Sequence, residues 1–207
     1  MECVTTKPYI TAALRTPVSE LDLSGSQPFS LESIVTLHAS RPIVIYTWGT
    51  YLSPVAALHA GGIDFICEGS DIPEPRSIIF ITPPGRSWSP GYFISLEPEM
   101  PTLIRIPFGS QKSSGSDRRS DFPLLFQTST FKTENVYKAE LPSAVRITWW
   151  RWASWWNWTT WWRWNSSGDV SDVPVLPEED QLPIRVVNND VTFKCVGEHV
   201  VAPSKAI

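Results

Sequence analysis

Two neighbouring segments decide the fold class, and both lie in residues 31–46, which read Leu-Glu-Ser-Ile-Val-Thr-Leu-His-Ala-Ser-Arg-Pro-Ile-Val-Ile-Tyr. In the first segment, alternate positions share one face of a strand: Leu31, Ser33, Val35 and Leu37. This period of two is typical of a β-strand that buries one face. The second segment, residues 42–46, is a continuous apolar run, as in strands that are covered on both faces. The stretch therefore predicts two β-strands that enter a buried core.

Short apolar segments of the same kind recur along the chain between turn signals. They cover residues 63–67, 77–81, 92–96, 103–108, 184–187 and 191–196. Asn188, Asn189 and Asp190 separate the last two segments and predict a hairpin turn. Residues 53–60 carry a serine cap, a proline in the first turn and two glycines after the end, which predicts one short helix. About eight short strands with regular turns predict an all-β fold, an antiparallel immunoglobulin-like β-sandwich with at most one short helix.

Composition narrows the classes of protein to which the chain can belong. Its 207 residues suffice for one domain, residues 1–207, and its 19 prolines argue against a helical bundle. A general nucleic-acid binder usually carries a basic face, and the net charge of −4 weighs against a nucleic-acid partner. Cys3, Cys67 and Cys195 form neither a disulfide framework nor a zinc-site spacing, and no metal or cofactor is expected. Because no signal peptide and no membrane-spanning apolar stretch is visible, the expected location is cytoplasmic.

Two polar segments interrupt the strand pattern. Residues 110–121 are rich in serine, glycine and charge, which predicts a mobile loop. Residues 166–183 carry five acidic residues, no basic residue and three prolines, which predicts an acidic, extended connector into the last pair of strands. Neither segment divides the chain into two domains.

The most unusual feature is a tryptophan-rich segment, residues 149–164, which holds nine of the 11 tryptophans. One pattern, Trp-Trp-x-Trp, occurs three times with a period of six, beginning at Trp149, Trp155 and Trp161. Because six is even, an extended chain keeps equivalent rings on the same face in every copy. In the first copy, Trp150 and Trp152 are therefore expected on one face. Trp149 and Arg151 are expected on the other.

The apolar area of this segment exceeds what one strand can bury. Each buried tryptophan removes about 150–250 Å² from water, whereas a monomer rarely exposes an apolar patch above a few hundred Å². As a single strand the segment would run about 53 Å, which is longer than usual. We expect residues 149–152 to be a core strand and the other two copies to form a protruding or self-associating surface. The candidate binding residues are Trp155, Trp156, Trp158, Trp161, Trp162, Arg163 and Trp164.

Four alternative interpretations of the extra copies stay open. The first is a repeat expansion in the gene that has no function. In the second, the extra rings simply pack over the open end of the sandwich. A third is an anchor at the membrane–water interface, because Trp-rich, Arg-spaced segments resemble puroindoline and the indolicidin class of membrane-active peptides. The flanking acidic residues oppose anionic lipid in that case. The fourth is a platform on which sugars or bases stack.

Catalytic signatures are weak. We find no HExxH, GxSxG, Walker A or GxGxxG pattern. His38 and His59 are the titratable candidates, together with Asp64, for an enzyme whose site lies on loops. If Asp64 and Glu68 share a strand face, they stand about 13 Å apart, which is too far for two carboxylates that act on one bond. The residues therefore favour a protein without catalytic activity.

Several phrases resemble a family of uncharacterised fungal β-sandwich proteins. They are Leu-His-Ala-Ser-Arg-Pro-Ile-Val-Ile-Tyr-Thr-Trp-Gly-Thr at residues 37–50, Tyr-Phe-Ile-Ser-Leu-Glu-Pro at 92–98, Pro-Phe-Gly at 107–109, and Trp-Trp-Arg-Trp at 149–152. Residues 47–50 are more distantly similar to the non-catalytic β-domain that precedes deuterolysin-type metallopeptidases. The zinc motif of those enzymes is absent, so the resemblance implies a fold and a fungal source but no peptidase activity. This chain departs from the family pattern by carrying three Trp-Trp-x-Trp copies where one is usual.

These observations predict a non-enzymatic binding or protein-interaction domain of unknown ligand. Its expected partner is another protein or a second copy of the chain, bound through the tryptophan-rich segment. The alternatives are a protein that associates with a membrane surface through that segment, and an enzyme of unknown reaction with a loop-borne site.

Overall fold

The computed structural model describes residues 7–53, 57–58, 62–70, 92–108, 131–153, 175–188 and 190–198. These residues form β-strands and one 3-10 turn, η3 (Glu178–Asp180), and no α-helix occurs among them. The predicted all-β class is therefore confirmed for this part of the chain. In the same residues, no helix is long and apolar enough to cross a membrane.

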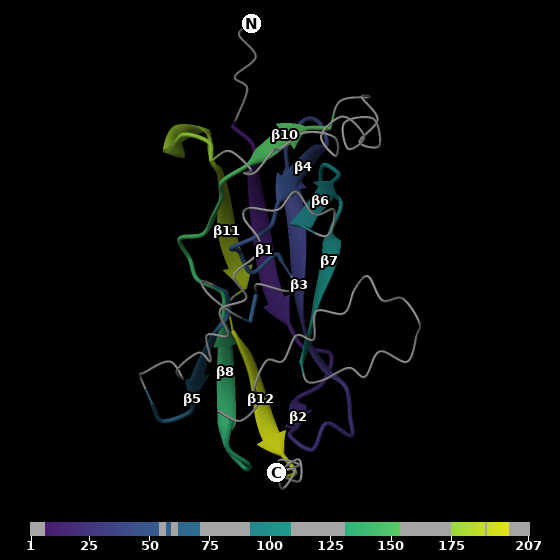
Figure 1. The fold of residues 1–207 in the computed structure, drawn as a ribbon, viewed down its shortest axis with the longest axis vertical. Coiled ribbons are helices and arrows are strands. Elements are labelled where there is room, and N and C mark those ends of the chain that lie inside the picture. The colour runs from purple at the N-terminus through teal and green to yellow at the C-terminus, as the bar shows by residue number, and fades with distance from the viewer. Residues whose placement is uncertain are drawn as a thin grey trace, which may run out of the picture.

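Three sheets carry the described strands. The strands are β1 (Tyr9–Arg15), β2 (Glu20–Asp22), β3 (Phe29–His38), β4 (Ile43–Tyr46), β5 (Asp64–Cys67), β6 (Phe93–Leu96), β7 (Thr102–Phe108), β8 (Val136–Glu140), β9 (Arg146–Ile147), β10 (Trp150–Trp152), β11 (Leu182–Asn188) and β12 (Val191–Val196). Sheet A has the order β7-β3-β1-β11-β9, sheet B the order β2-β12-β8-β5, and sheet C the order β10-β4-β6. The molecule is elongated, with sheets A and C toward one end and sheet B toward the other (Figure 1).

The two ends of the described chain run side by side through two sheets. Strand β1 pairs with β11 in parallel, and β2 pairs with β12 in parallel. The partner numbers differ by 174 at Ile10–Ile184, by 175 at Ala13–Asn188 and by 174 again at Glu20–Lys194, so the register shifts by one residue within sheet A and returns in sheet B. These parallel pairs depart from the predicted all-antiparallel arrangement.

The predicted hairpin at residues 188–190 is wrong. Strands β11 and β12 belong to different sheets and follow one another along the long axis in the same direction (Figure 1). Each finds its parallel partner at the other end of the chain, so the turn residues connect two sheets instead of folding the chain back on itself. The register between β1 and β11 shifts between Ala12 and Ala13, which pair with Val186 and Asn188. Val187 is therefore the extra residue of this bulge, and it is 65% exposed.

One hydrophobic core receives side chains from all three sheets. The alternation predicted along β3 is confirmed, since Leu31, Ser33, Val35 and Leu37 are fully buried. All four residues of β4 are buried, as predicted from their continuous apolar run. Ile43 and Ile45 face the main core, whereas Val44 and Tyr46 belong to a second, smaller cluster on the other side of sheet C.

The predicted helix at residues 53–60 is described at Ser53, Ala57 and Leu58 alone. The Ala57 N–H donates to the Ser53 carbonyl at 2.8 Å, the four-residue span of one helical turn. The chain then closes tightly, because a Cβ at Gly62 would lie 1.8 Å from the Ala57 carbonyl oxygen. Glycine is required here by the close approach of two backbones.

Other predicted segments fall partly or wholly outside the described residues. The predicted mobile loop at 110–121 and the predicted strand at 77–81 lie outside them. Of the predicted connector 166–183, residues 175–183 are described. The connector ends earlier than predicted, because β11 begins at Leu182. Leu182 is fully buried, and both Leu182 and Pro183 already belong to β11, paired with β9.

Candidate functional site

The first copy of the tryptophan pattern forms an edge strand of sheet C. Strand β10 pairs antiparallel with β4, with Trp150 opposite Ile45 and Trp152 opposite Ile43. The strand predicted at residues 149–152 is thus found at Trp150–Trp152, packed against the core, with Trp149 directly before it. Among the described residues, no strand lies on the other side of β10.

The two faces of β10 carry the rings as predicted from the even period. Trp150 and Trp152 pack edge to face, with ring centroids 5.3 Å apart, against the main core. Trp149 is buried in the second cluster, and its ring lies beneath the Arg151 guanidinium at 5.4 Å. Every ring of the first copy is thereby covered largely by the chain's own residues.

The outer edge of β10 presents unpaired backbone groups within the described part of the chain. The Tyr46 N–H donates to the Trp149 carbonyl at 3.0 Å, and the Ala153 N–H donates to the Pro42 carbonyl at 2.8 Å. Antiparallel strands alternate their bonding sides, so the N–H and C=O groups of Trp150 and Trp152 point away from β4. An edge of this kind is a template on which another extended chain can pair.

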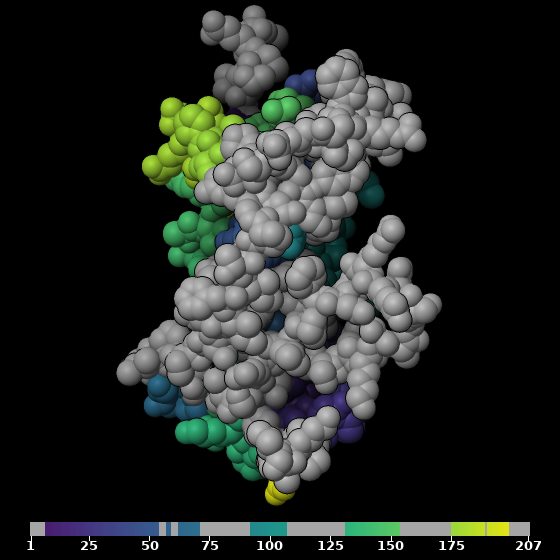
Figure 2. Space-filling model, in the orientation of Figure 1, coloured from purple at the N-terminus to yellow at the C-terminus, as the bar shows by residue number. Residues whose placement is uncertain are grey.

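An acidic turn stands beside this edge. The Trp150 indole N–H donates to the Asp180 carbonyl at 2.8 Å, and this bond ties β10 to η3. Glu178, Glu179 and Asp180 are exposed, and η3 forms a knob on the surface next to β10 (Figure 2). Positive charge near the edge comes from exposed Arg151, so the charges around β10 are of both signs.

The predicted binding residues continue from this edge but lie outside the described residues. They are Trp155, Trp156, Trp158, Trp161, Trp162, Arg163 and Trp164. The folded part of the segment was expected to end at Trp152, and it extends one residue further, to Ala153. Ala153 packs against the second cluster and pairs with Pro42, so it belongs to the folded edge.

A second constellation lies on the outer face of sheet A and involves one of the predicted histidines. His38 ends β3, and its Nε2 lies 3.0 Å from the Thr11 hydroxyl oxygen. Its Nδ1 lies 3.1 Å from a carboxylate oxygen of Glu99. We call these three residues the His38 relay.

Sequence reasoning found one of the three residues of this relay. Thr11 and Glu99 are 27 and 61 positions from His38, and no local pattern marks them. Neither of the other two catalytic candidates is found among the residues of the relay. His59 lies outside the described residues, and Asp64 begins β5 in sheet B, not sheet A.

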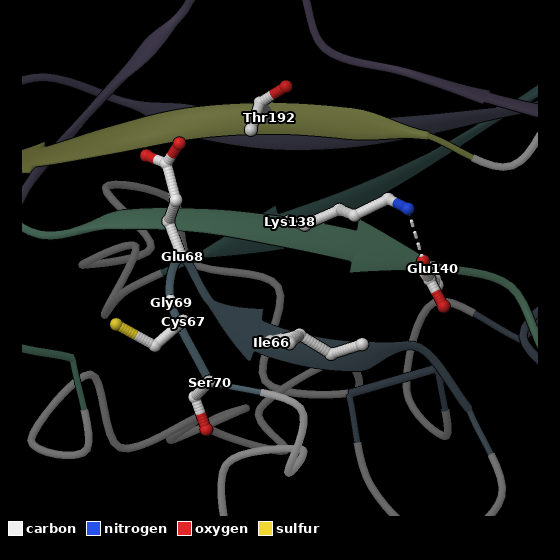
Figure 3. Close-up of a pocket in the computed structure, with 8 residues that line it drawn as sticks. All are labelled: Ile66, Cys67, Glu68, Gly69, Ser70, Lys138, Glu140 and Thr192. Atoms are coloured by element: carbon white, nitrogen blue, oxygen red, sulfur yellow. Dashed lines mark ion pairs between the residues drawn. The ribbon is translucent and has the colours of Figure 1, made fainter.

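A shallow hollow of about 410 Å³ lies on sheet B. It is lined by Ile66, Cys67, Glu68, Gly69, Ser70, Lys138, Glu140 and Thr192. Lys138 reaches toward Glu140, and Cys67 points away from that pair (Figure 3). The Lys138 ammonium lies 2.6 Å from Glu140 and 3.3 Å from Asp190, and the first of these bonds contributes most to raising the lysine pKa. Lys138 thus pairs with Glu140 on its own strand and with Asp190 next to β12, and these ion pairs engage two of the charged groups of the hollow.

Cys67 and Cys195 are both free thiols. Cys195 is fully buried, and this burial, with a smaller contribution from Cys67, raises the pKa of its thiol to about 12. A thiol of this kind is inert at neutral pH. Among the described residues no group of three His, Cys, Asp or Glu side chains could hold a metal ion.

Comparison with protein-family models, with curated proteins and with solved structures finds no match to this chain. The resemblance to fungal β-sandwich proteins therefore stays a prediction from the motifs. The candidate site is defined by the geometry of the β10 edge, which ends at Ala153.

Proposed function

We propose that the chain is a protein-interaction domain that associates through its tryptophan-rich segment. The observation that carries this proposal is the place of the first copy. It is an edge strand whose rings are covered, whose outer backbone groups are unpaired in the described residues, and from which the other two copies continue directly.

The partner that fits this edge best is a second copy of the same chain. Extended segments bind exposed sheet edges through main-chain hydrogen bonds, and alternate side chains give the contact its specificity. The second and third copies repeat the sequence pattern of the first copy, so an extended segment of a neighbouring chain would bring rings to matching positions. Tryptophan and arginine are also the side chains enriched where interfaces are buried.

Charge favours pairing between different copies of the pattern. If two β10 strands paired with each other about their centres, Arg151 would stand opposite Arg151, and like charges directly opposite destabilise a sheet. If β10 paired with the second copy of a neighbour, Arg151 would stand opposite Asn157. We therefore propose a contact between the first copy of one chain and the second copy of the next.

Sedimentation velocity over a range of concentrations tests this proposal. The test variant replaces Trp155, Trp156, Trp158, Trp161, Trp162 and Trp164 by serine. A variant lacking residues 110–121 is the control, because it alters a segment outside the tryptophan pattern. We expect the unmodified chain and the control to associate with rising concentration, and the serine variant to stay monomeric with the same circular dichroism. Equal sedimentation of all three would contradict the proposal.

A membrane surface is the second candidate, because indole rings favour the membrane–water interface. The exposed acidic turn η3 beside β10 opposes binding to anionic lipid. Co-sedimentation with vesicles of neutral and of anionic phospholipid separates the two proposals. Binding to vesicles by the monomer would favour the membrane, and association without vesicles favours the protein contact.

We also propose two finer features of the chain. The first is an immunoglobulin-like arrangement of the strands, supported by the antiparallel pairs β1–β3, β3–β7 and β8–β12 around one core. The second is membership of the fungal β-sandwich family, supported by the quoted motifs.

A further inference from the structure

The His38 relay has the connectivity of a hydroxyl activated by a histidine and a carboxylate. Thr11 lies in the middle of β1, His38 at the end of β3, and Glu99 in the turn after β6. The hydroxyl oxygen lies 3.0 Å from Nε2, and Nδ1 lies 3.1 Å from the carboxylate. Each distance is within hydrogen-bonding range.

The hydrogen-bond chemistry fixes the direction of the relay. A carboxylate can only accept, so the proton shared between His38 and Glu99 must sit on Nδ1. In the neutral ring Nε2 is then bare, and it accepts the proton of the Thr11 hydroxyl. The imidazole is thus in the tautomer that a general base needs.

Neighbouring groups hold the imidazole in place. The His38 ring stacks on Tyr9 with centroids 4.5 Å apart, and the Arg185 guanidinium covers Tyr9 at 4.0 Å. Glu99 adopts a φ of 55°, which is uncommon for a residue with a side chain, and its N–H donates to the Leu37 carbonyl at 2.9 Å. Strain of this kind is often kept where a side chain must be aimed.

The relay is open to solvent and lies beside apolar residues. Side-chain exposure is 27% for His38 and 65% for Glu99. Two residues after Thr11, on the same outer face of sheet A, Ala13 is paired with Ile34, and Ile34 with Leu103. These three side chains form an apolar row, in which Leu103 is 43% exposed. Arg185 is the direct strand partner of Thr11, and its guanidinium lies over the ring of Tyr9, two residues away on β1.

We propose that Thr11 is the nucleophile of an acyl-transfer site that hydrolyses carboxylic esters with a small apolar acyl group. The acyl group would lie along Ala13, Ile34 and Leu103, and the Arg185 side chain would turn from Tyr9 toward the carbonyl oxygen as that oxygen gains negative charge. The Thr11 oxygen attacks the carbonyl carbon while its proton passes to Nε2 of His38. The bond to the alcohol oxygen breaks, and Nε2 returns the proton to that oxygen.

The acyl group is then released by water. Water attacks the Thr11 ester and gives a proton to Nε2, and the carboxylic acid leaves as Thr11 regains its proton. One ester and one water thus give one acid and one alcohol. Glu99 is a positioning residue in this scheme, because it acts through His38. The site is distinct from the edge of β10, so neither proposal depends on the other.

The test uses p-nitrophenyl acetate with the full chain, release of p-nitrophenol as the rate, and mass spectrometry to locate the acetyl group. We expect the acetyl group on Thr11, and a rate about 10²–10⁴-fold lower for Thr11→Val and His38→Gln. Thr36→Val is the matched control, since Thr36 stands directly opposite Thr11 on the same face, and it should keep the rate.

Two conservative variants separate chemistry from folding. Thr11→Ser should keep the activity, and Glu99→Asp should recover part of the rate that Glu99→Gln loses. Acetylation of other residues with an unchanged rate in Thr11→Val would overturn the proposal. If Thr11→Val does not fold, His38→Gln and Glu99→Gln test the same proton transfer, and an unchanged rate in both would also overturn the proposal.

Discussion

Replacing the first ring of each tryptophan copy by alanine separates the structural copy from the other two. Trp149, Trp155 and Trp161 occupy the same position in the repeat, so the three substitutions are chemically identical. Trp149 is 3% exposed and packs edge to face on Phe93, with ring centroids 5.5 Å apart. The other two follow the folded edge that ends at Ala153.

The structure sets the expected magnitude for Trp149→Ala. A tryptophan buries about 150–250 Å², which corresponds to about 4–6 kcal/mol at roughly 25 cal/mol per Å² as an upper estimate. Large-to-small changes of this kind in cores cost about 3–5 kcal/mol. We expect a loss in that range for Trp149→Ala and a change within about 0.5 kcal/mol for Trp155→Ala and Trp161→Ala.

Urea unfolding followed by circular dichroism measures the three free energies of unfolding at a concentration at which the chain is monomeric. An equal and large loss for all three variants would refute the assignment of one copy to the core and two to binding. A small loss for Trp149→Ala would refute the packing of the second cluster.

Three further predictions follow from single residues. Gly62→Ala should cost about 3 kcal/mol or more in urea unfolding because its Cβ would meet the Ala57 carbonyl, whereas Gly25→Ala meets no atom within 4 Å and should cost only about 1 kcal/mol for its φ of 72°; equal losses would contradict the close approach. Cys195 should resist a thiol reagent at neutral pH in the folded chain and react after unfolding, because burial raises its pKa to about 12. Hydrogen bonds from Ser26 and Ser24 lower the pKa of Asp22 from 3.8 to about 2, so the stability that they give is present above about pH 4 and lost as the pH falls toward 2. Asp22→Asn should remove this acid-dependent loss.

Local patterns in the sequence predicted the strands that bury one clear face. The alternation along β3 and the continuous run of β4 identified both strands, because each depends on neighbours along the chain. Strand β1 was missed, since its inward positions include Ala12 and its outward ones Thr11 and Ala13, which blur the contrast between the faces. The even period of the tryptophan pattern placed the rings of β10 on the correct faces.

Pairing between distant segments could not be predicted. The turn residues at 188–190 favour a hairpin locally, but β11 and β12 each gain a parallel partner at the beginning of the chain, and this outweighs the local preference. The His38 relay was hidden for the same reason, because its residues come from β1, β3 and the turn after β6. The sequence pointed to His38 as a candidate, but no local pattern links it to Thr11 or Glu99.

Backbone hydrogen exchange at the edge of β10 tests the central proposal most directly. We predict that the amides of Trp150 and Trp152 exchange rapidly in the dilute monomer and become protected as the concentration rises, since a second chain then pairs with them. The Ala153 amide, which already donates to Pro42, is the internal control and should be protected throughout. Association of the chain with unchanged exchange at Trp150 and Trp152 would contradict the proposed contact.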